Sequence, residues 1–268
     1  MTPIGEMDTC NGCMTAKGRR VALAKKDLTK ASRPAQRLQI DLSGPFFATT
    51  AGSKYWLKII CQYSRKCFDY FLKEKSEVAN KLTHLLDPLK GASFEVEYIR
   101  CDDAGEHQAV ELLCEQKGIQ IEFTGANTPQ RNGIVERRFL TDGERATAAM
   151  VSAGLTSSMR RMCWAEFAKS SSIITNTICN SIHDAPPDFL FYGKDSNLPK
   201  HLMEMGRVGY VSKDRTIKGK KFVTDNADKV IMVGFANNHS RDTYRLYRPC
   251  TRGIIQTRNV KWATWKPT

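Results

Sequence analysis

The sequence predicts an α/β (α+β) fold, in which a mixed sheet with flanking helices precedes a small β-barrel-like C-terminal module. Between residues 36 and 185, three strand patterns come first and alternating helix and strand patterns follow. From about Gly206 the chain changes to short strands separated by turn residues, which is the spacing of a small β-barrel. A length of 268 residues fits one large domain and one smaller domain.

The first three strands are predicted from alternation and from turn residues. Apolar residues alternate along Arg37 to Ser43, and Gly44-Pro45 ends this strand. Two further apolar runs, Lys54 to Tyr63 and Cys67 to Lys73, flank a polar segment at 64–66. They therefore predict an antiparallel hairpin.

The next segments alternate between helix and strand. Ser76 is placed to cap a helix that runs to about Asp87, just before Pro88. The remaining core elements are expected as a strand over Phe94–Cys101 with Asp102 just past its end, a helix over Glu106–Lys117 that Gly118 ends, a strand over Ile119–Phe123, a loop over Thr124–Gly133, and helices over Ile134–Ser152 and Arg161–Ile182. This order is that of a ribonuclease-H-like mixed five-stranded sheet, although other α/β folds share it.

Composition and turn-rich stretches divide the chain into four predicted parts. These are a polar, basic lead-in at 1–35, a core at 36–185, a linker at 186–204 and a β-rich module at 205–268. The strands expected in the last part are Val208–Ser212, Val230–Phe235, Tyr244–Tyr247 and Ile254–Val260.

The charge of the chain predicts a polyanionic partner. The net charge is +13 and the pI is about 9.4, and phosphate contacts supply most sequence-independent affinity for nucleic acid. No apolar run approaches the roughly 18 residues needed to span a bilayer, and the N-terminus lacks the pattern of a signal peptide. The nine cysteines are odd in number and lie mostly in apolar runs, so we expect reduced thiols. Together, these observations predict an intracellular location and no membrane.

Three carboxylates stand in distinctive settings. Asp41 lies in the first strand, Asp102 follows the fourth, and Glu136 begins a helix behind the string Thr-Pro-Gln-Arg-Asn-Gly. Carboxylates that converge in space can hold two divalent cations, which stabilise the attacking and leaving oxygens of a phosphodiester during in-line displacement. A single surface carboxylate is usually only solvated. A metal-binding role for these three residues is therefore inferred from the sequence segments on either side of them.

These strings, in this order, resemble the integrase of copia-type long-terminal-repeat retrotransposons, a Pol polyprotein fragment with a retroviral-integrase-like catalytic core. The resemblance runs from about Cys10 to Trp262. The segments that carry it are Asp41-Leu42-Ser43-Gly44-Pro45, Gly52-Ser53-Lys54-Tyr55-Trp56-Leu57, Tyr63-Ser64-Arg65, Lys73-Glu74-Lys75-Ser76-Glu77, Arg100-Cys101-Asp102-Asp103-Ala104-Gly105-Glu106, Thr128-Pro129-Gln130-Arg131-Asn132-Gly133-Ile134-Val135-Glu136-Arg137, Phe191-Tyr192-Gly193-Lys194, Val233-Gly234-Phe235, Tyr244-Arg245-Leu246-Tyr247 and Arg258-Asn259-Val260.

The resemblance implies that Asp41, Asp102 and Glu136 form a catalytic triad that binds two Mg²⁺ or Mn²⁺ ions. It implies a polynucleotidyl transferase that removes terminal nucleotides from the DNA ends of the element and joins the new 3′-hydroxyl to target DNA. Both steps are transesterifications without a covalent protein intermediate. DNA is the implied partner, self-association is expected because such integrases bridge two DNA ends, and function is expected in the nucleus.

The chain also departs from the family pattern. Between Asp102 and Glu136 lie 33 residues, slightly fewer than is usual in the family. Leu140 and Thr147 stand at positions where basic residues recur in the family. The absence of basic side chains at these two positions weakens the expected binding of DNA. Cys10 and Cys13 have zinc-ligand spacing, but no histidine precedes them, so a remnant zinc half-site without bound zinc is favoured over a zinc site.

Residues expected to bind DNA fall in two places. Those beside Glu136 are Gln130, Arg131, Asn132, Arg137 and Arg138, and those in the basic run of the C-terminal module are Lys218, Lys220 and Lys221. For the basic run, an ordinary solvated face stays open as the alternative. For the whole chain, two other functions stay open: a catalytically decayed or domesticated core that only binds DNA, and a ribonuclease-H-like nuclease.

Overall fold

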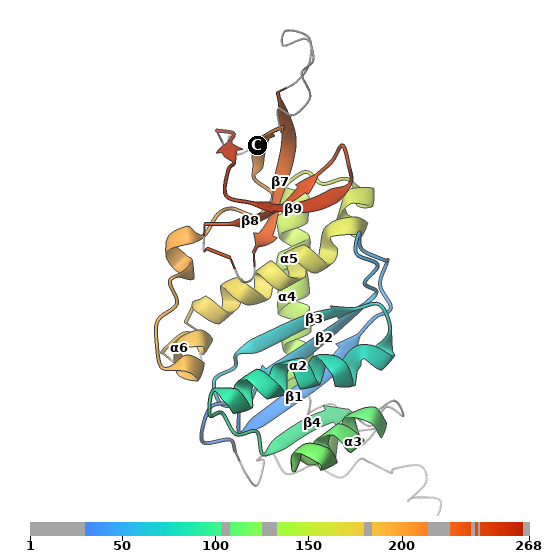
Figure 1. Ribbon diagram of the computed structural model, residues 1–268, viewed down its shortest axis with the longest axis vertical. Coiled ribbons are helices and arrows are strands. Elements are labelled where there is room, and N and C mark those ends of the chain that lie inside the picture. Colours follow the sequence, from blue (N-terminus) through green and yellow to red (C-terminus); the bar gives the residue numbers. More distant parts are fainter. Residues whose placement is uncertain are drawn as a thin grey trace, which may run out of the picture. The chain divides into compact units, whose positions relative to one another are not determined.

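The computed structural model describes residues 30–102, 108–124, 133–179, 184–213, 226–236, 239–240 and 242–264. The described residues from Ala31 onward belong to one compact unit. This unit contains two five-stranded sheets, and a long helix packs between them (Figure 1).

The first sheet has the strand order β3-β2-β1-β4-β5. Its strands are β1 (Arg37–Ser43), β2 (Tyr55–Cys61), β3 (Cys67–Leu72), β4 (Tyr98–Asp102) and β5 (Gln120–Thr124). The first three strands pair antiparallel, whereas β1, β4 and β5 run parallel. The predicted ribonuclease-H-like mixed sheet is confirmed. In one detail the prediction was wrong, because Asp102 is the last residue of β4 and not the residue after it.

Two helices, α2 (Val78–Gly91) and α3 (Gln108–Lys117), cover one face of this sheet (Figure 1). The apolar side chains Leu82, Leu86 and Val110 of these helices are buried with Leu38 and Leu57 of the strands. Gly118, with a φ of +68°, ends α3 as expected, because glycine adopts the left-handed conformation without strain.

The predicted start and end of α2 were both wrong. Ser76 lies in a short 3₁₀ turn, η1 (Lys75–Glu77), and no side chain caps α2. The helix also continues through Pro88 to Gly91. This extension buries Leu89 in the core, and the burial offsets the hydrogen bond that proline cannot donate.

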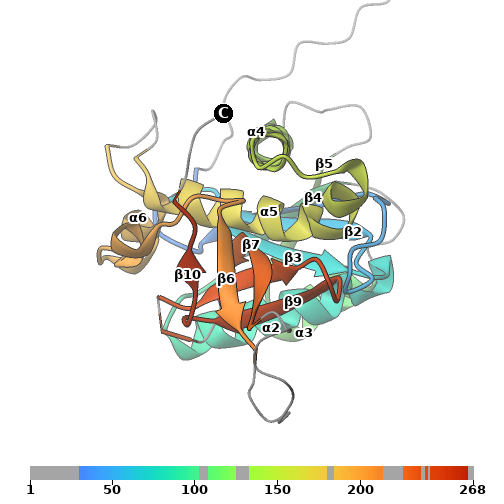
Figure 2. The same ribbon diagram turned by 90° about the horizontal axis from the view of Figure 1, so that it is seen from above.

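The helices α4 (Gly133–Ser152) and α5 (Ser157–Thr177) pack on the opposite face (Figure 2). α4 contacts β1 and β2, and α5 contacts β3. The second helix begins earlier than predicted, because the Thr156 hydroxyl accepts a hydrogen bond from the Met159 amide and so caps it. Among the described helices, none has the length and apolar character needed to cross a membrane.

The stretch predicted as a linker contains helical structure. It holds the helix α6 (Pro187–Tyr192) and a 3₁₀ turn, η3 (Leu198–His201). Phe191 is buried and stacks on Phe94 with ring centroids 4.8 Å apart. Aromatic packing on the core therefore orders a segment that its turn residues alone did not predict as helical.

The second sheet has the order β10-β6-β7-β8-β9. Its strands are β6 (Val208–Ser212), β7 (Ala227–Phe235), β8 (Tyr244–Arg248), β9 (Gly253–Thr257) and β10 (Lys261–Trp262), all paired antiparallel. The four predicted strands are confirmed, and the short β10 is an addition. α5 packs on β7, where the Ser170 hydroxyl donates to the Val233 carbonyl oxygen at 3.2 Å.

Candidate active site

The structure brings Asp41 and Asp102 together at one end of the first sheet. Arg37, Leu38 and Gln39 of β1 pair in parallel with residues 98–100 of β4, and Asp41 and Asp102 each lie two residues beyond the last of these pairs. Both aspartates line one cavity of about 180 Å³. Two of the three predicted acids therefore share a pocket.

Among the described residues that line this pocket, Lys75 is the cationic one. It comes from η1, directly after β3, and its ammonium lies 6.0 Å from the centre of the Tyr55 ring. Lys75 belongs to one of the segments that carry the family resemblance, but no role was predicted for it from the sequence. The sheet topology shows why Lys75 lies at this pocket. The end of β3 pairs with the start of β2, and the start of β2 pairs with the end of β1, the strand that carries Asp41.

Glu136 lies in the first turn of α4 and is exposed. Val135 beside it is fully buried against Ile60 and Cys67, so this turn is anchored on the sheet. Within the described part of the chain, no three or more His, Cys, Asp or Glu side chains gather closely enough to hold a metal ion. The structure thus pairs Asp41 with Asp102 but does not draw Glu136 into a three-acid cluster with them.

The donor set of the pocket suits a hard divalent cation. Its acidic ligands are carboxylates, and Mg²⁺ and Mn²⁺ prefer carboxylate and water oxygens. Asp41 and Asp102 fit one such ion, with waters completing its shell. A second ion requires a third carboxylate, which Glu136 can supply only from α4.

The residues expected to bind DNA divide into several groups. Arg137 is exposed on α4. Arg138 points inward instead: its side chain is 13% exposed, and its Nε donates to Asp142 Oδ2 at 2.7 Å. The other expected DNA-binding residues and the half-site cysteines lie outside the described residues: Gln130, Arg131, Asn132, Lys218, Lys220, Lys221, Cys10 and Cys13.

Arginines of the second sheet are engaged in ion pairs. Arg245 of β8 contacts both carboxylate oxygens of Glu166 on α5, at 2.7 and 2.6 Å. The hydrogen bonds to Glu166 raise the pKa of the Arg245 guanidinium. Arg248 lies 3.5 Å from Asp228. Arg245 therefore joins the second sheet to α5.

This chain was compared with family models, with curated proteins and with solved structures. No family model matches it. Over 270 aligned residues, or 94% of its length, it is 27% identical to the retrovirus-related Pol polyprotein from transposon TNT 1-94 of Nicotiana tabacum. The match spans 18% of that polyprotein, so the chain corresponds to a small part of its relative.

Two solved structures also match. A chain of the simian T-cell lymphotropic virus intasome, in complex with PP2A regulatory subunit B56 gamma, matches with a TM-score of 0.51 and 12% identity over 97% of this chain and 86% of that chain. The catalytic core domain of HTLV-2 integrase with magnesium, in its trimeric form, matches with a TM-score of 0.44 and 10% identity over 60% of this chain and 99% of that chain. The intasome match supports a shared fold. With the Pol match, it confirms the predicted resemblance: this chain is similar to part of a retrotransposon Pol polyprotein and shares the fold of a chain of the simian T-cell lymphotropic virus intasome.

Proposed function

We propose that this chain is a retroelement integrase core that carries out metal-dependent DNA 3′-end processing and strand transfer. The observation that carries the proposal is the shared pocket of Asp41 and Asp102 at the carboxyl ends of two parallel strands. The similarity to a retrotransposon Pol polyprotein along 94% of the chain supports it. The core at 36–185 would carry the chemistry, and the module at 205–268 would add contacts to DNA.

Each side chain of the site has a proposed task. Asp41 and Asp102 would hold one divalent ion, and Glu136 would complete the site for a second. Bound in this way, the ions would supply charge stabilisation of the attacking and leaving oxygens. Lys75 would pair with a non-bridging oxygen of the scissile phosphate and so orient it, since an ammonium is a compact partner for phosphate.

DNA is the proposed partner of the exposed α4 surface, and further copies of the chain are proposed because joining needs two DNA ends. We place this activity in the nucleus, where the target DNA lies. A decayed core that only binds DNA is the second candidate, and Leu140 and Thr147 on α4 favour it because neither carries a positive charge to pair with a phosphate.

The test is magnesium-dependent joining of a short 3′-hydroxyl donor duplex to plasmid DNA by the purified chain. We expect joining by the wild type and by Glu111→Gln, an exposed acid on α3, but none by Asp102→Asn. Salt-sensitive DNA binding without any joining would favour the DNA-binding candidate. Cutting without joining would favour a ribonuclease-H-like nuclease.

A further inference from the structure

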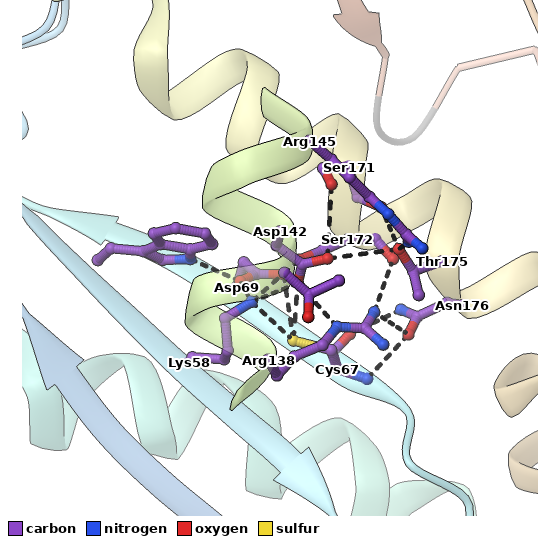
Figure 3. A network of polar contacts seen from close by, with 12 residues as sticks. Lys58, Cys67, Asp69, Arg138, Asp142, Arg145, Ser171, Ser172, Thr175 and Asn176 are labelled. Atoms are coloured by element: carbon purple, nitrogen blue, oxygen red, sulfur yellow. Dashed lines mark hydrogen bonds and ion pairs between the residues drawn. The ribbon is translucent and has the colours of Figure 1, made fainter. Parts of the chain in front are cut away.

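A buried charged cluster joins β2 and β3 to α4 and α5 (Figure 3). Lys58 of β2 lies at its centre with none of its side chain exposed. Its ammonium donates to Asp142 Oδ2 at 2.7 Å, to Asp69 Oδ1 at 2.9 Å and to the Ser172 hydroxyl at 3.1 Å. One side chain of the sheet is therefore bonded to both helices and to the neighbouring strand.

Asp142 is the corresponding centre on α4. Its Oδ2 also accepts from Arg138 Nε and from the Ser172 hydroxyl, both at 2.7 Å. Its Oδ1 accepts from the Thr175 hydroxyl at 3.3 Å. Because these donors come from α4 itself, from β2 and from α5, the carboxylate holds three elements at one point (Figure 3).

The charges of the cluster balance. Burial alone would lower the pKa of Lys58, but the neighbouring acidic groups Cys67, Asp69 and Asp142 outweigh it and raise this pKa. Burial raises the pKa of the Cys67 thiol to about 12, so the thiol is neutral near neutral pH and the two carboxylates hold the Lys58 charge. Burial would likewise raise the pKa of Asp142, but Lys58 and Arg138 lower it overall. The charged forms of Lys58 and Asp142 are thus the stable ones.

Two elements of the cluster, β2 and α4, lie next to the acids of the candidate site. Asp41 directly opposes Lys58 in the antiparallel ladder of β1 and β2, so the two side chains point to the same face of the sheet. Glu136 lies six residues before Asp142 on α4, which is about 9 Å along the helix axis. The bond between Lys58 and Asp142 therefore connects the strand pair that carries Asp41 to the helix that carries Glu136.

We propose that Lys58 and Asp142 are positioning residues that fix α4 on the sheet and so set the place of Glu136 relative to Asp41. This inference rests on the proposed function. The apolar contact of Val135 with Ile60 holds the first turn of α4 against the sheet, but such a contact permits sliding. Charge-assisted hydrogen bonds have fixed lengths and directions, so they specify one register of the helix.

The experiment measures binding of Mn²⁺ to the 268-residue chain by electron paramagnetic resonance, beside its thermal midpoint by circular dichroism. Asp142→Glu keeps the charge but adds one methylene, which would displace α4. The double variant Lys58→Met/Asp142→Leu removes one cation and one anion together, and such a replacement of a buried pair is often tolerated by the fold. It carries the test where Asp142→Glu fails to fold. The matched control is Arg245→Met/Glu166→Leu, a pair whose hydrogen bonds join α5 to β8.

We expect Asp142→Glu and the double variant, while still folded, to bind Mn²⁺ about 10- to 100-fold more weakly, as for residues that orient metal ligands. The control should change the thermal midpoint but not the Mn²⁺ affinity. Folded variants with wild-type affinity would overturn the positioning role, as would a control that weakens binding equally. If the wild type binds Mn²⁺ no better than Asp102→Asn does, the proposed function fails as well, so the two failures are distinguishable.

Discussion

The candidate site and the buried cluster contain acidic side chains in opposite environments, although they are only one strand apart. Asp41 and Asp102 line a pocket, whereas Asp142 is fully buried beside Lys58 and Arg138. In the pocket, the ligand of a carboxylate can come from outside the protein. In the cluster, the protein supplies every cation itself. The environment of an acid, and not its residue type, therefore decides whether its carboxylate is open to an outside ligand or bound within the fold.

The same contrast exists along α4. Glu136 is exposed in its first turn, and Asp142 is buried less than two turns later. Hence one helix carries an exposed acid, which we propose for the site, and a buried acid that binds the helix to the sheet. Substitutions of equal chemistry at these positions should have unequal effects.

The largest expected effect is on the free energy of unfolding, when an aspartate is replaced by asparagine either in the cluster or in the pocket. Asp142→Asn should lower the free energy of unfolding by about 3 to 5 kcal/mol, because it leaves Asp69 as the one carboxylate of the cluster for the two cations Lys58 and Arg138. Asp102→Asn should change it by no more than about 0.5 kcal/mol, because this side chain is exposed. Urea unfolding measures both, and Glu144→Gln on the outer face of α4 is the control. Equal losses at the two aspartates would remove the distinction between site and cluster.

A smaller effect is expected from pH. The pKa of Asp142 is lowered in the folded chain by Lys58 and Arg138 against the opposing effect of burial. Its contribution to stability is therefore complete above the unfolded pKa, about 3.9, and is lost as the pH falls through the lower folded pKa. Between about pH 5 and pH 3, the urea midpoint of the wild type should fall more steeply than that of Asp142→Asn. Parallel curves for the two proteins would show that Asp142 titrates as an ordinary exposed acid.

Local pattern was sufficient for most of the fold. The bounds of β1 and β6 agree with their predicted ranges, because alternation and turn residues mark both strands. The errors occur where tertiary packing overrides local signals. Burial of Leu89 carries α2 past Pro88, and stacking of Phe191 on Phe94 orders α6. Neither contact has a signature in the local sequence.

For the candidate site, the strings around Asp41 and Asp102 predicted two acids that the structure places in one pocket. The buried cluster had no such signal. Lys58 lies in a strand that is otherwise apolar. Asp142 is a polar position in a helical pattern, where a charged side chain usually faces solvent. Only the pairing of β1, β2 and α4 shows that these charges neutralise each other. The DNA contact predicted for Arg138 stays a prediction, but the structure pairs its guanidinium with Asp142, four residues along the same helix.

The smallest effect tests the outer face of α4, where Leu140 and Thr147 stand in place of the expected basic residues. Leu140 is 62% exposed there, and Leu112 is 55% exposed on α3, so an arginine at either position should cost little stability. If α4 faces DNA, Leu140→Arg should add a phosphate contact and make the slope of log K against log salt steeper by about 0.9. Leu112→Arg should leave that slope near its wild-type value, because α3 lies on the other face of the sheet. Duplex binding by fluorescence anisotropy over a salt series measures both slopes. Equal steepening by the two variants would mean that added charge acts through the net charge of the chain, and α4 would then have no special place in DNA binding.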